Sequence, residues 1–330
     1  NTTGSENTAV GFRALDANVD TANNTAIGTA VLGANTASNN TAIGYLALYT
    51  NIGGTPNVAV GKRALYSNTT GTENTAIGPD AMYANTESSR NVAVGYGTLD
   101  AQTDGTGYNT AVGNNAMTTN TSGAYNTALG ANALTLNAGG AQNTAVGYNA
   151  LDANASGNYN TGIGHNALGG AQTAHYNTAV GWNCLLVATT DDNTAMGYNA
   201  AKSVSNATRI TAIGTESLKE LSSNSNNTAV GYGAGRNVTG EANTFIGCNA
   251  GLLATSCDYN VVIGVNAGGS AGVMTGNNNV LIGSSTGDIF TSGTKCVAVG
   301  AGALGTTTTQ TENTAIGYNA GSSNTGGNNT

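Results

Sequence analysis

The stretch NTAVGYNAL at residues 143–151 recurs with small changes along the whole of this 330-residue chain. Its first five residues form a repeat core that occurs nineteen times, first at Asn7 and last at Asn313. Of the 18 steps between successive cores, 13 are 17 residues long, three are 16, one is 18 and one is 19. A short fixed period without a helical pattern is typical of proteins in which small units stack on one another. The repeat therefore predicts one continuous array over residues 1–330, in place of the two domains that this length would otherwise suggest.

The composition narrows the class of protein. Charged residues make up only 8% of the chain, the net charge is −8, and the nine basic residues are scattered. A chain without a basic patch does not fit a nucleic-acid partner. No run of 18 apolar residues is present that could insert into a membrane. So few charges and 49 Gly would also suit a disordered linker, but such a linker would not keep a bulky aliphatic residue at one phase of a fixed period.

The sequence begins and ends inside a repeat. Residues 1–6 (NTTGSE) match residues 68–73 (NTTGTE), and Asn329 and Thr330 match the start of a further core. Natural repeat arrays end in atypical capping units. We therefore expect the chain to be a segment of a longer fibre.

Numbering each repeat from its core Asn reveals a strand-like pattern. Position 5 is Gly in all nineteen repeats, position 4 is always Val, Ile, Leu or Met, and position 3 is Ala in fifteen. Position 2 is Thr in fourteen repeats and Val in five, and no charged residue occurs at positions 1 to 5. This pattern is typical of a short β-strand that ends in a bend at Gly. Alternation places positions 2 and 4 on one face, and because both faces are uncharged we expect a second layer, such as a neighbouring chain, to cover that face.

The remainder of each repeat predicts a second strand and two bends. Positions 8 and 9 form another small apolar point, as in Ala150 and Leu151. Position 12 is often Asn and position 15 is often Gly, and both residue types favour turns and left-handed backbone geometry. Successive coils would lie about 4.8 Å apart. The sequence thus predicts an all-β, parallel β-solenoid (a β-roll) of about 19 coils with a 17-residue period.

Stacking would align identical residues of successive coils into ladders. The Asn at position 1, present in seventeen repeats, is expected to hydrogen-bond amide to amide along the stack. The Gly at position 5 shares with Ala a face that suits a narrow interior. The residues that we single out for this structural ladder are Asn7, Asn24, Asn40, Asn57, Asn74, Asn143, Gly11, Gly28, Gly44, Gly61, Gly78 and Gly147.

Position 6 carries a partial column of aromatic residues. Its members are Phe12, Tyr45, Tyr96, Tyr148, Trp182, Tyr198, Tyr232 and Tyr318. The simpler interpretation is aromatic packing on an edge that faces solvent. The alternative is a surface on which carbohydrate rings stack.

The stretch at residues 143–151 resembles the head repeats of trimeric autotransporter adhesins, which carry a similar Asn-Ser-Val-Ala-Ile-Gly core. It is even more similar to repeats in the shafts of phage tail-fibre-like proteins and bacterial surface fibres. The resemblance extends over the entire chain and concerns architecture, not ligand. It implies a left-handed parallel β-roll that packs as a trimer, although the 17-residue period is longer than is usual for those head repeats.

Residues that could carry chemistry are few. The two His residues, His165 and His175, occupy different positions of their coils, and Asp and Glu recur at no single position. Neither a metal site nor a nucleophile motif is indicated, so we expect no enzyme, no catalytic residue and no cofactor. Cys248 and Cys257 belong to one coil and could form a disulfide bridge, but the simpler interpretation of the four Cys residues is unpaired buried thiols.

Three Asn residues are candidate glycosylation sites. Asn68, Asn120 and Asn154 each begin an Asn-x-Ser/Thr triplet at position 12, where we expect an exposed bend. An Asn- and Thr-rich chain also produces such triplets by chance.

The pattern favours an extracellular or surface-exposed structural fibre, such as a cell-surface fibre, a secreted filament or the shaft of a virion fibre. Its partners would be copies of itself, as a homotrimer or an end-to-end filament. The alternative is an adhesin or receptor-binding tail fibre that recognises surface glycans through the Tyr-bearing edge or the insert near Val273, Met274 and Thr275. A minor alternative is an ice-binding solenoid, although position 4 is aliphatic in every repeat.

Overall fold

The computed structural model describes residues 3–103, 107–269, 271–323 and 326–329. Within these ranges the chain forms 19 three-residue strands and no helix. Every strand pairing is parallel, and each strand pairs with its counterpart one repeat away. The predicted all-β parallel solenoid with a period of about 17 residues is therefore confirmed.

The strands occupy positions 2 to 4 of each repeat. Their bounds are β1 (Thr8–Val10), β2 (Thr25–Ile27), β3 (Thr41–Ile43), β4 (Val58–Val60), β5 (Thr75–Ile77), β6 (Val92–Val94), β7 (Thr110–Val112), β8 (Thr127–Leu129), β9 (Thr144–Val146), β10 (Thr161–Ile163), β11 (Thr178–Val180), β12 (Thr194–Met196), β13 (Thr211–Ile213), β14 (Thr228–Val230), β15 (Thr244–Ile246), β16 (Val261–Ile263), β17 (Val280–Ile282), β18 (Val297–Val299) and β19 (Thr314–Ile316).

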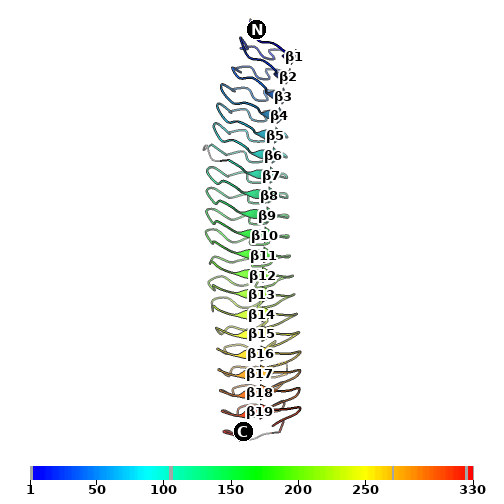
Figure 1. Ribbon diagram of the computed structural model, residues 1–330, viewed down its shortest axis with the longest axis vertical. Coiled ribbons are helices and arrows are strands. Elements are labelled where there is room, and N and C mark those ends of the chain that lie inside the picture. The colour runs from blue at the N-terminus through cyan, green and yellow to red at the C-terminus, as the bar shows by residue number, and fades with distance from the viewer. Residues whose placement is uncertain (1–2, 104–106, 270, 324–325, 330) are drawn as a thin grey trace. The chain divides into compact units, whose positions relative to one another are not determined.

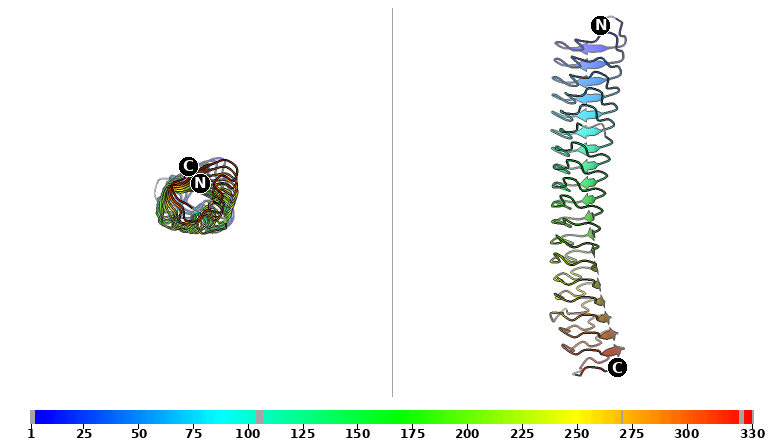
Figure 2. Two further views of the ribbon diagram at one scale, coloured as in Figure 1. Left: turned by 90° about the horizontal axis from the view of Figure 1, so that it is seen from below. Right: turned by 90° about the vertical axis from the view of Figure 1, so that its left-hand side faces the viewer.

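The chain divides into two compact units, Asn1–Ala174 with strands β1 to β10 and His175–Thr330 with strands β11 to β19. Within each unit successive strands lie side by side in chain order (Figure 1). The register joins equal repeat positions, as where Val58, Ala59 and Val60 pair with Thr75, Ala76 and Ile77. Viewed end-on, the coils of each unit superimpose (Figure 2). A single array across both units stays a prediction.

The strand pattern follows from the alternation of its three residues. The Ala at position 3 points into the coil and is fully buried, as Ala59 and Ala76 show. The residues at positions 2 and 4 point outward and remain half exposed, as with Val58 at 37% and Ile77 at 40%. A methyl group is the side chain that a narrow coil interior accommodates, whereas the outer face takes β-branched residues. No described residue of the chain covers that outer face.

The prediction of a second strand in each coil is wrong. Positions 8 and 9 lie in a turn whose backbone alternates in hand, and in the coil that begins at Asn57 both Arg63 and Leu65 have positive φ, 56° and 55°. This segment still bonds to the next coil, because the Leu65 N–H donates to the Ala81 carbonyl at 2.9 Å. Because left-handed and right-handed residues alternate, the backbone N–H and carbonyl groups of this turn point toward neighbouring coils although the turn is not an extended strand. The periodicity of the side chains does not reveal this conformation.

The Gly at position 5 allows adjacent coils to approach closely. Gly78 has a φ of 133°, and a Cβ atom placed on it would lie 2.3 Å from the carbonyl oxygen of Gly95 in the next coil. No L-residue adopts this conformation readily, and no side chain fits that gap. Gly11, Gly28, Gly44, Gly61 and Gly147 have the same geometry, with Cβ-to-oxygen distances of 2.3 to 2.6 Å.

The second unit fills its interior in a different way. Position 9, a Leu in most coils of the first unit, becomes Gly at Gly235 and Gly251, while position 3 becomes Phe245. The Phe245 ring occupies the vacated space, because a Cβ on Gly251 would lie 2.2 Å from its Cε1 and one on Gly235 would lie 2.7 Å from its Cδ2. A large residue at one position thus compensates for small ones at another, as dense core packing requires.

Candidate functional site

The Asn at position 1 links three parts of the solenoid through its buried amide. In the coil that begins at Asn57, its Nδ2 donates to the Gly71 carbonyl across the coil at 2.9 Å. Its Oδ1 accepts the backbone N–H of Asn74 in the next coil, also at 2.9 Å. The ladder is therefore mainly side chain to backbone. The predicted amide-to-amide bond is present in part of it, as where Asn91 Nδ2 donates to Asn74 Oδ1 at 3.2 Å and Asn260 Nδ2 donates to Asn243 Oδ1 at 3.0 Å. The corresponding Oδ1 acceptors in other coils include Asn7, Asn24, Asn40, Asn74 and Asn143.

A second Asn ladder runs through position 12, and this one is amide to amide. Asn68 Nδ2 donates to Asn51 Oδ1 at 2.9 Å, and Asn68 Oδ1 accepts from Asn85 Nδ2 at 2.8 Å. Asn68 Nδ2 also donates to the Gly71 carbonyl at 3.0 Å. Both Asn ladders of a coil therefore converge on one carbonyl at position 15. In this coil Gly leaves room for the amide, because a Cβ on Gly71 would lie 2.4 Å from Asn68 Oδ1.

This ladder breaks where the sequence changes. Gln102 replaces Asn at position 12, and its Oε1 accepts from Asn120 Nδ2. Ala171 replaces the Asn that would follow Asn154. Among the described residues, Asn85 Oδ1 and Asn154 Oδ1 are accordingly buried without a hydrogen-bond partner. The first unit thus carries a buried polar ladder that the repeats of the second unit replace with apolar residues such as Val204 and Val238.

The expectation that position 12 is an exposed bend is wrong. Asn68, Asn120 and Asn154 are all fully buried. The Nδ2 atom that a glycan would use donates in each of them to two acceptors inside the coil. The glycosylation hypothesis therefore loses its premise. Sequence reasoning assumed that polar stretches face solvent, but the carbonyl at position 15 supplies these amides with an internal partner.

The outer face of the sheet is an uncharged surface in each unit. Position 4 is exposed at 37% in Ile43, 40% in Ile77 and 49% in Leu129 and Met196. The aromatic residues of position 6 are exposed as predicted. The sequence interpretation did not include two further Tyr columns. One is at position 10 (Tyr49, Tyr66 and Tyr83), and the other is at the last position of the repeat (Tyr108, Tyr125, Tyr159, Tyr176 and Tyr259). Their regular 17-residue spacing was the available signal.

The four Cys residues are all unpaired. Cys184, Cys257 and Cys296 are buried, as predicted, whereas Cys248 is exposed, so that expectation fails for it. Loss of solvation on burial raises the pKa of Cys184 and that of Cys257 to about 12. Thiols with such pKa values are poor nucleophiles and poor metal ligands at neutral pH.

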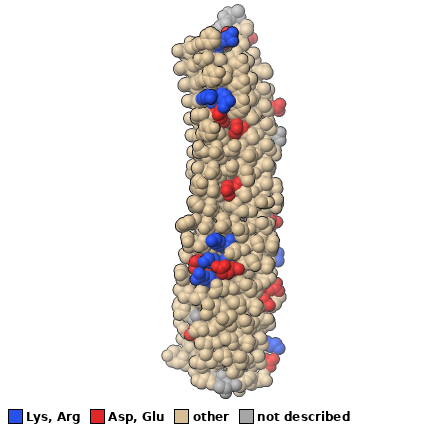
Figure 3. Space-filling model, turned by 180° about the vertical axis from the view of Figure 1, so that it is seen from behind, with Lys and Arg blue, Asp and Glu red and all other residues tan. Residues whose placement is uncertain are grey.

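The described residues hold no group of three His, Cys, Asp or Glu side chains that could bind a metal ion. Within the same ranges, no helix is long and apolar enough to cross a membrane. Figure 3 shows charged side chains gathered in small clusters of both signs on an otherwise uncharged face. In the second unit one such cluster joins Lys219 to Glu216 and Glu220, and Arg236 to Glu216, at 3.1 to 3.7 Å. Surface ion pairs of this kind contribute little to stability.

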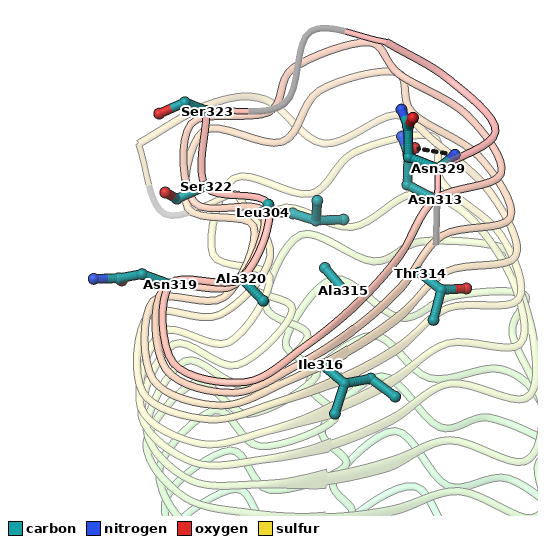
Figure 4. A pocket seen from close by; sticks show the side chains of 11 residues that line it. Leu304, Asn313, Thr314, Ala315, Ile316, Asn319, Ala320, Ser322, Ser323 and Asn329 are labelled. Atoms are coloured by element: carbon teal, nitrogen blue, oxygen red, sulfur yellow. Dashed lines mark hydrogen bonds between the residues drawn. The ribbon is translucent and has the colours of Figure 1, made fainter.

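A hollow of about 640 Å³ lies at the face of the coil that contains β19 (Figure 4). Ala315 and Leu304 point into the coil there, while Thr314 and Ile316 point away from it. The same repeat positions in preceding coils are covered by the next coil. This hollow is the cross-section of the stack, so its lining reflects the repeat and not a separate ligand site.

Comparison with known proteins adds no family to this geometry. No protein-family model matches the chain, and no curated protein matches it significantly. The resemblance to adhesin head and fibre-shaft repeats therefore remains an inference from the repeat core.

Proposed function

We propose that this chain is a segment of an extracellular structural fibre, or fibre shaft, built from stacked 17-residue coils. The single observation that supports it best is the double Asn ladder, in which coils of the first unit supply hydrogen-bond partners to the next coil, as from Asn51 to Asn68 and from Asn57 to Asn74. Repeats that depend on their neighbours in this way form extended arrays, because no coil buries its interior alone.

The second part of the proposal is that copies of the chain pack together through the outer sheet face. Each strand presents two uncharged side chains to solvent, such as Val58 and Ile77 in β4 and β5. The aliphatic side chain at position 4 recurs in every coil, and a row of exposed aliphatic side chains is costly to leave in water. A homotrimer with left-handed coils, located outside the cell, is the arrangement that the resemblance implies.

Electron microscopy and light scattering test both parts. We expect an elongated particle whose axial repeat is about 4.8 Å and whose mass corresponds to several chains. A compact globule would contradict the fibre. A monomer at all concentrations would contradict the packing of copies against one another.

Variants locate the contact between copies. Replacing Ile43 and Ile77 by Lys should release single chains, because each Lys puts a charge into the outer face. Thr70→Lys is the matched control, since Thr70 is exposed but lies outside the sheet. Unchanged circular dichroism in all variants would show that the coils remain folded. Equal masses for all variants would refute the sheet-face contact.

A further inference from the structure

A hollow of about 360 Å³ opens on the first unit where two columns of side chains are interrupted. One column is position 7, with Arg63 and Asp80 followed by Gly97, and the other is position 10, with Tyr83 followed by Asp100. One coil thus lacks a large side chain in both columns. Its lining includes Arg63, Asp80, Tyr83, Gly97, Asp100 and Asn115.

One wall of this hollow is an aromatic ring at the end of a stack. The rings of Tyr49 and Tyr66 lie 5.6 Å apart and those of Tyr66 and Tyr83 lie 5.3 Å apart, with interplanar angles of 8° and 12°. Because the rings stack from coil to coil, the face of Tyr83 that Tyr66 does not cover is directed toward the coil of Asp100. The face of an aromatic ring is electron-rich and attracts polarised C–H groups of a ligand.

A polar group beside that ring needs a donor. Asp100 Oδ1 is buried and has no hydrogen-bond partner among the described residues. Loss of solvation, and next the charge of Asp80, raise the pKa of the Asp100 carboxyl. A buried acceptor without a partner is unfavourable, and a hydroxyl group of a ligand would supply the missing hydrogen bond.

The other charges at the hollow are already paired. Arg63 Nε and Nη2 donate to Asp80 Oδ1 and Oδ2 at 2.7 and 2.9 Å, a bidentate pair. The Arg63 guanidinium also lies 5.0 Å from the centroid of the Tyr83 ring. With Asp80 neutralised, Asp100 remains as an acceptor, and Asn115 offers an amide that can both donate and accept.

We propose that this hollow binds one pyranose ring of a neutral glycan. The apolar face of the sugar ring would stack on Tyr83, and its hydroxyl groups would donate to Asp100 and bond with Asn115. An anion would be repelled by Asp100, and a metal ion would have to displace Arg63 from Asp80. The volume lies at the lower end of ligand pockets, which suits one ring. The proposal goes beyond the fibre function and does not depend on the number of chains.

Saturation-transfer NMR with methyl glycosides of glucose, galactose, mannose and N-acetylglucosamine, followed by a glycan array, tests the proposal on the full chain. Adenosine and N-acetyltyrosine amide serve as flat ligands that are not sugars. We expect saturation of at least one glycoside, with binding in the millimolar range. No transfer to any glycoside, or stronger transfer to the other two compounds, would overturn the proposal.

Three variants locate the site. Tyr83→Ala removes the ring wall, and Gly97→Asn fills the hollow with the residue that Asn115 places at the same position of the next coil, where the backbone φ is nearly equal (57° and 54°). Both should weaken binding by about tenfold or more. Tyr49→Ala is the matched control, because it removes the opposite end ring of the same stack and does not line the hollow. Circular dichroism reports folding. If folded Tyr83→Ala and Gly97→Asn proteins bind as the parent does, the hollow is not the site, whereas the fibre proposal would be unaffected.

Discussion

Replacing Asn68 by Ala measures what the position-12 ladder contributes to stability. The side chain is fully buried and makes three hydrogen bonds, to Asn51, Gly71 and Asn85, at 2.8 to 3.0 Å. At about 1 kcal/mol for each bond, the loss is about 3 kcal/mol. Asn51 Oδ1 also loses its donor, which brings the expected cost to about 4 kcal/mol. Gly71 O keeps its bond from Asn57, so it adds nothing.

Guanidinium unfolding followed by circular dichroism should show a lower midpoint, with an unchanged slope. Hydrogen exchange should quicken in residues 51–90 and stay slow in coils farther away, because repeat stability is local. Asn114→Ala is the matched control, because Asn114 is exposed. Equal midpoints for Asn68→Ala and Asn114→Ala would refute the claim that the ladder stabilises the stack.

Asn68→Asp separates hydrogen bonding from side-chain shape. The carboxylate would face Asn51 Oδ1 and the Gly71 carbonyl, two acceptors, in a buried site. The pKa of this Asp in the folded state should therefore be raised above that in the unfolded state. The penalty is then full at neutral pH and shrinks as the pH falls through the raised value, since a protonated Asp can donate one bond. A pH-independent difference from the parent would contradict this account.

Further perturbations have definite outcomes. Gly78→Ala should cost several kcal/mol in thermal unfolding, because its Cβ would meet the Gly95 carbonyl. Phe245→Ala should open a cavity and cost about 3 to 5 kcal/mol, and calorimetry that shows no change would contradict the packing that we describe. Of the four thiols, only Cys248 should react with a disulfide reagent before unfolding. The raised pKa of Cys184 favours its neutral form in the fold, so stability should fall as the pH rises from about 8.5, the ordinary thiol value, toward about 12. No thermal hysteresis is expected, since position 4 places aliphatic residues such as Ile77 beside the outward Thr.

The sequence predicted the fold because the repeat carries it. Equal spacing of Gly78, Gly95 and their counterparts required equal backbone geometry in every coil, and Ala at position 3 indicated a narrow interior. The sequence did not reveal where polar side chains point. Asn68 faces inward because the Gly71 carbonyl accepts its amide, and no periodicity distinguishes that from an exposed turn.

The candidate ligand site was hidden for a related reason. The sequence marks position 6 as the aromatic column. The hollow instead depends on the position-10 column and on the smaller residues Gly97 and Asp100. A gap in a column is visible only when both columns are known to lie beside each other. Knowing that the columns are adjacent requires the turn geometry of positions 7 to 10, and the prediction of a second strand there was wrong.

The pairing of Phe245 with Gly235 and Gly251 also bears on how the chain finds its alignment while folding. Coils with the same residues at every inward position are interchangeable, so a strand can dock one full repeat out of place at little energetic cost. Around Phe245 such a slip would set the ring against Leu218, where the space is already filled. A bulky ring that fits only beside the two Gly residues therefore restricts its strand to one pairing register among many similar coils.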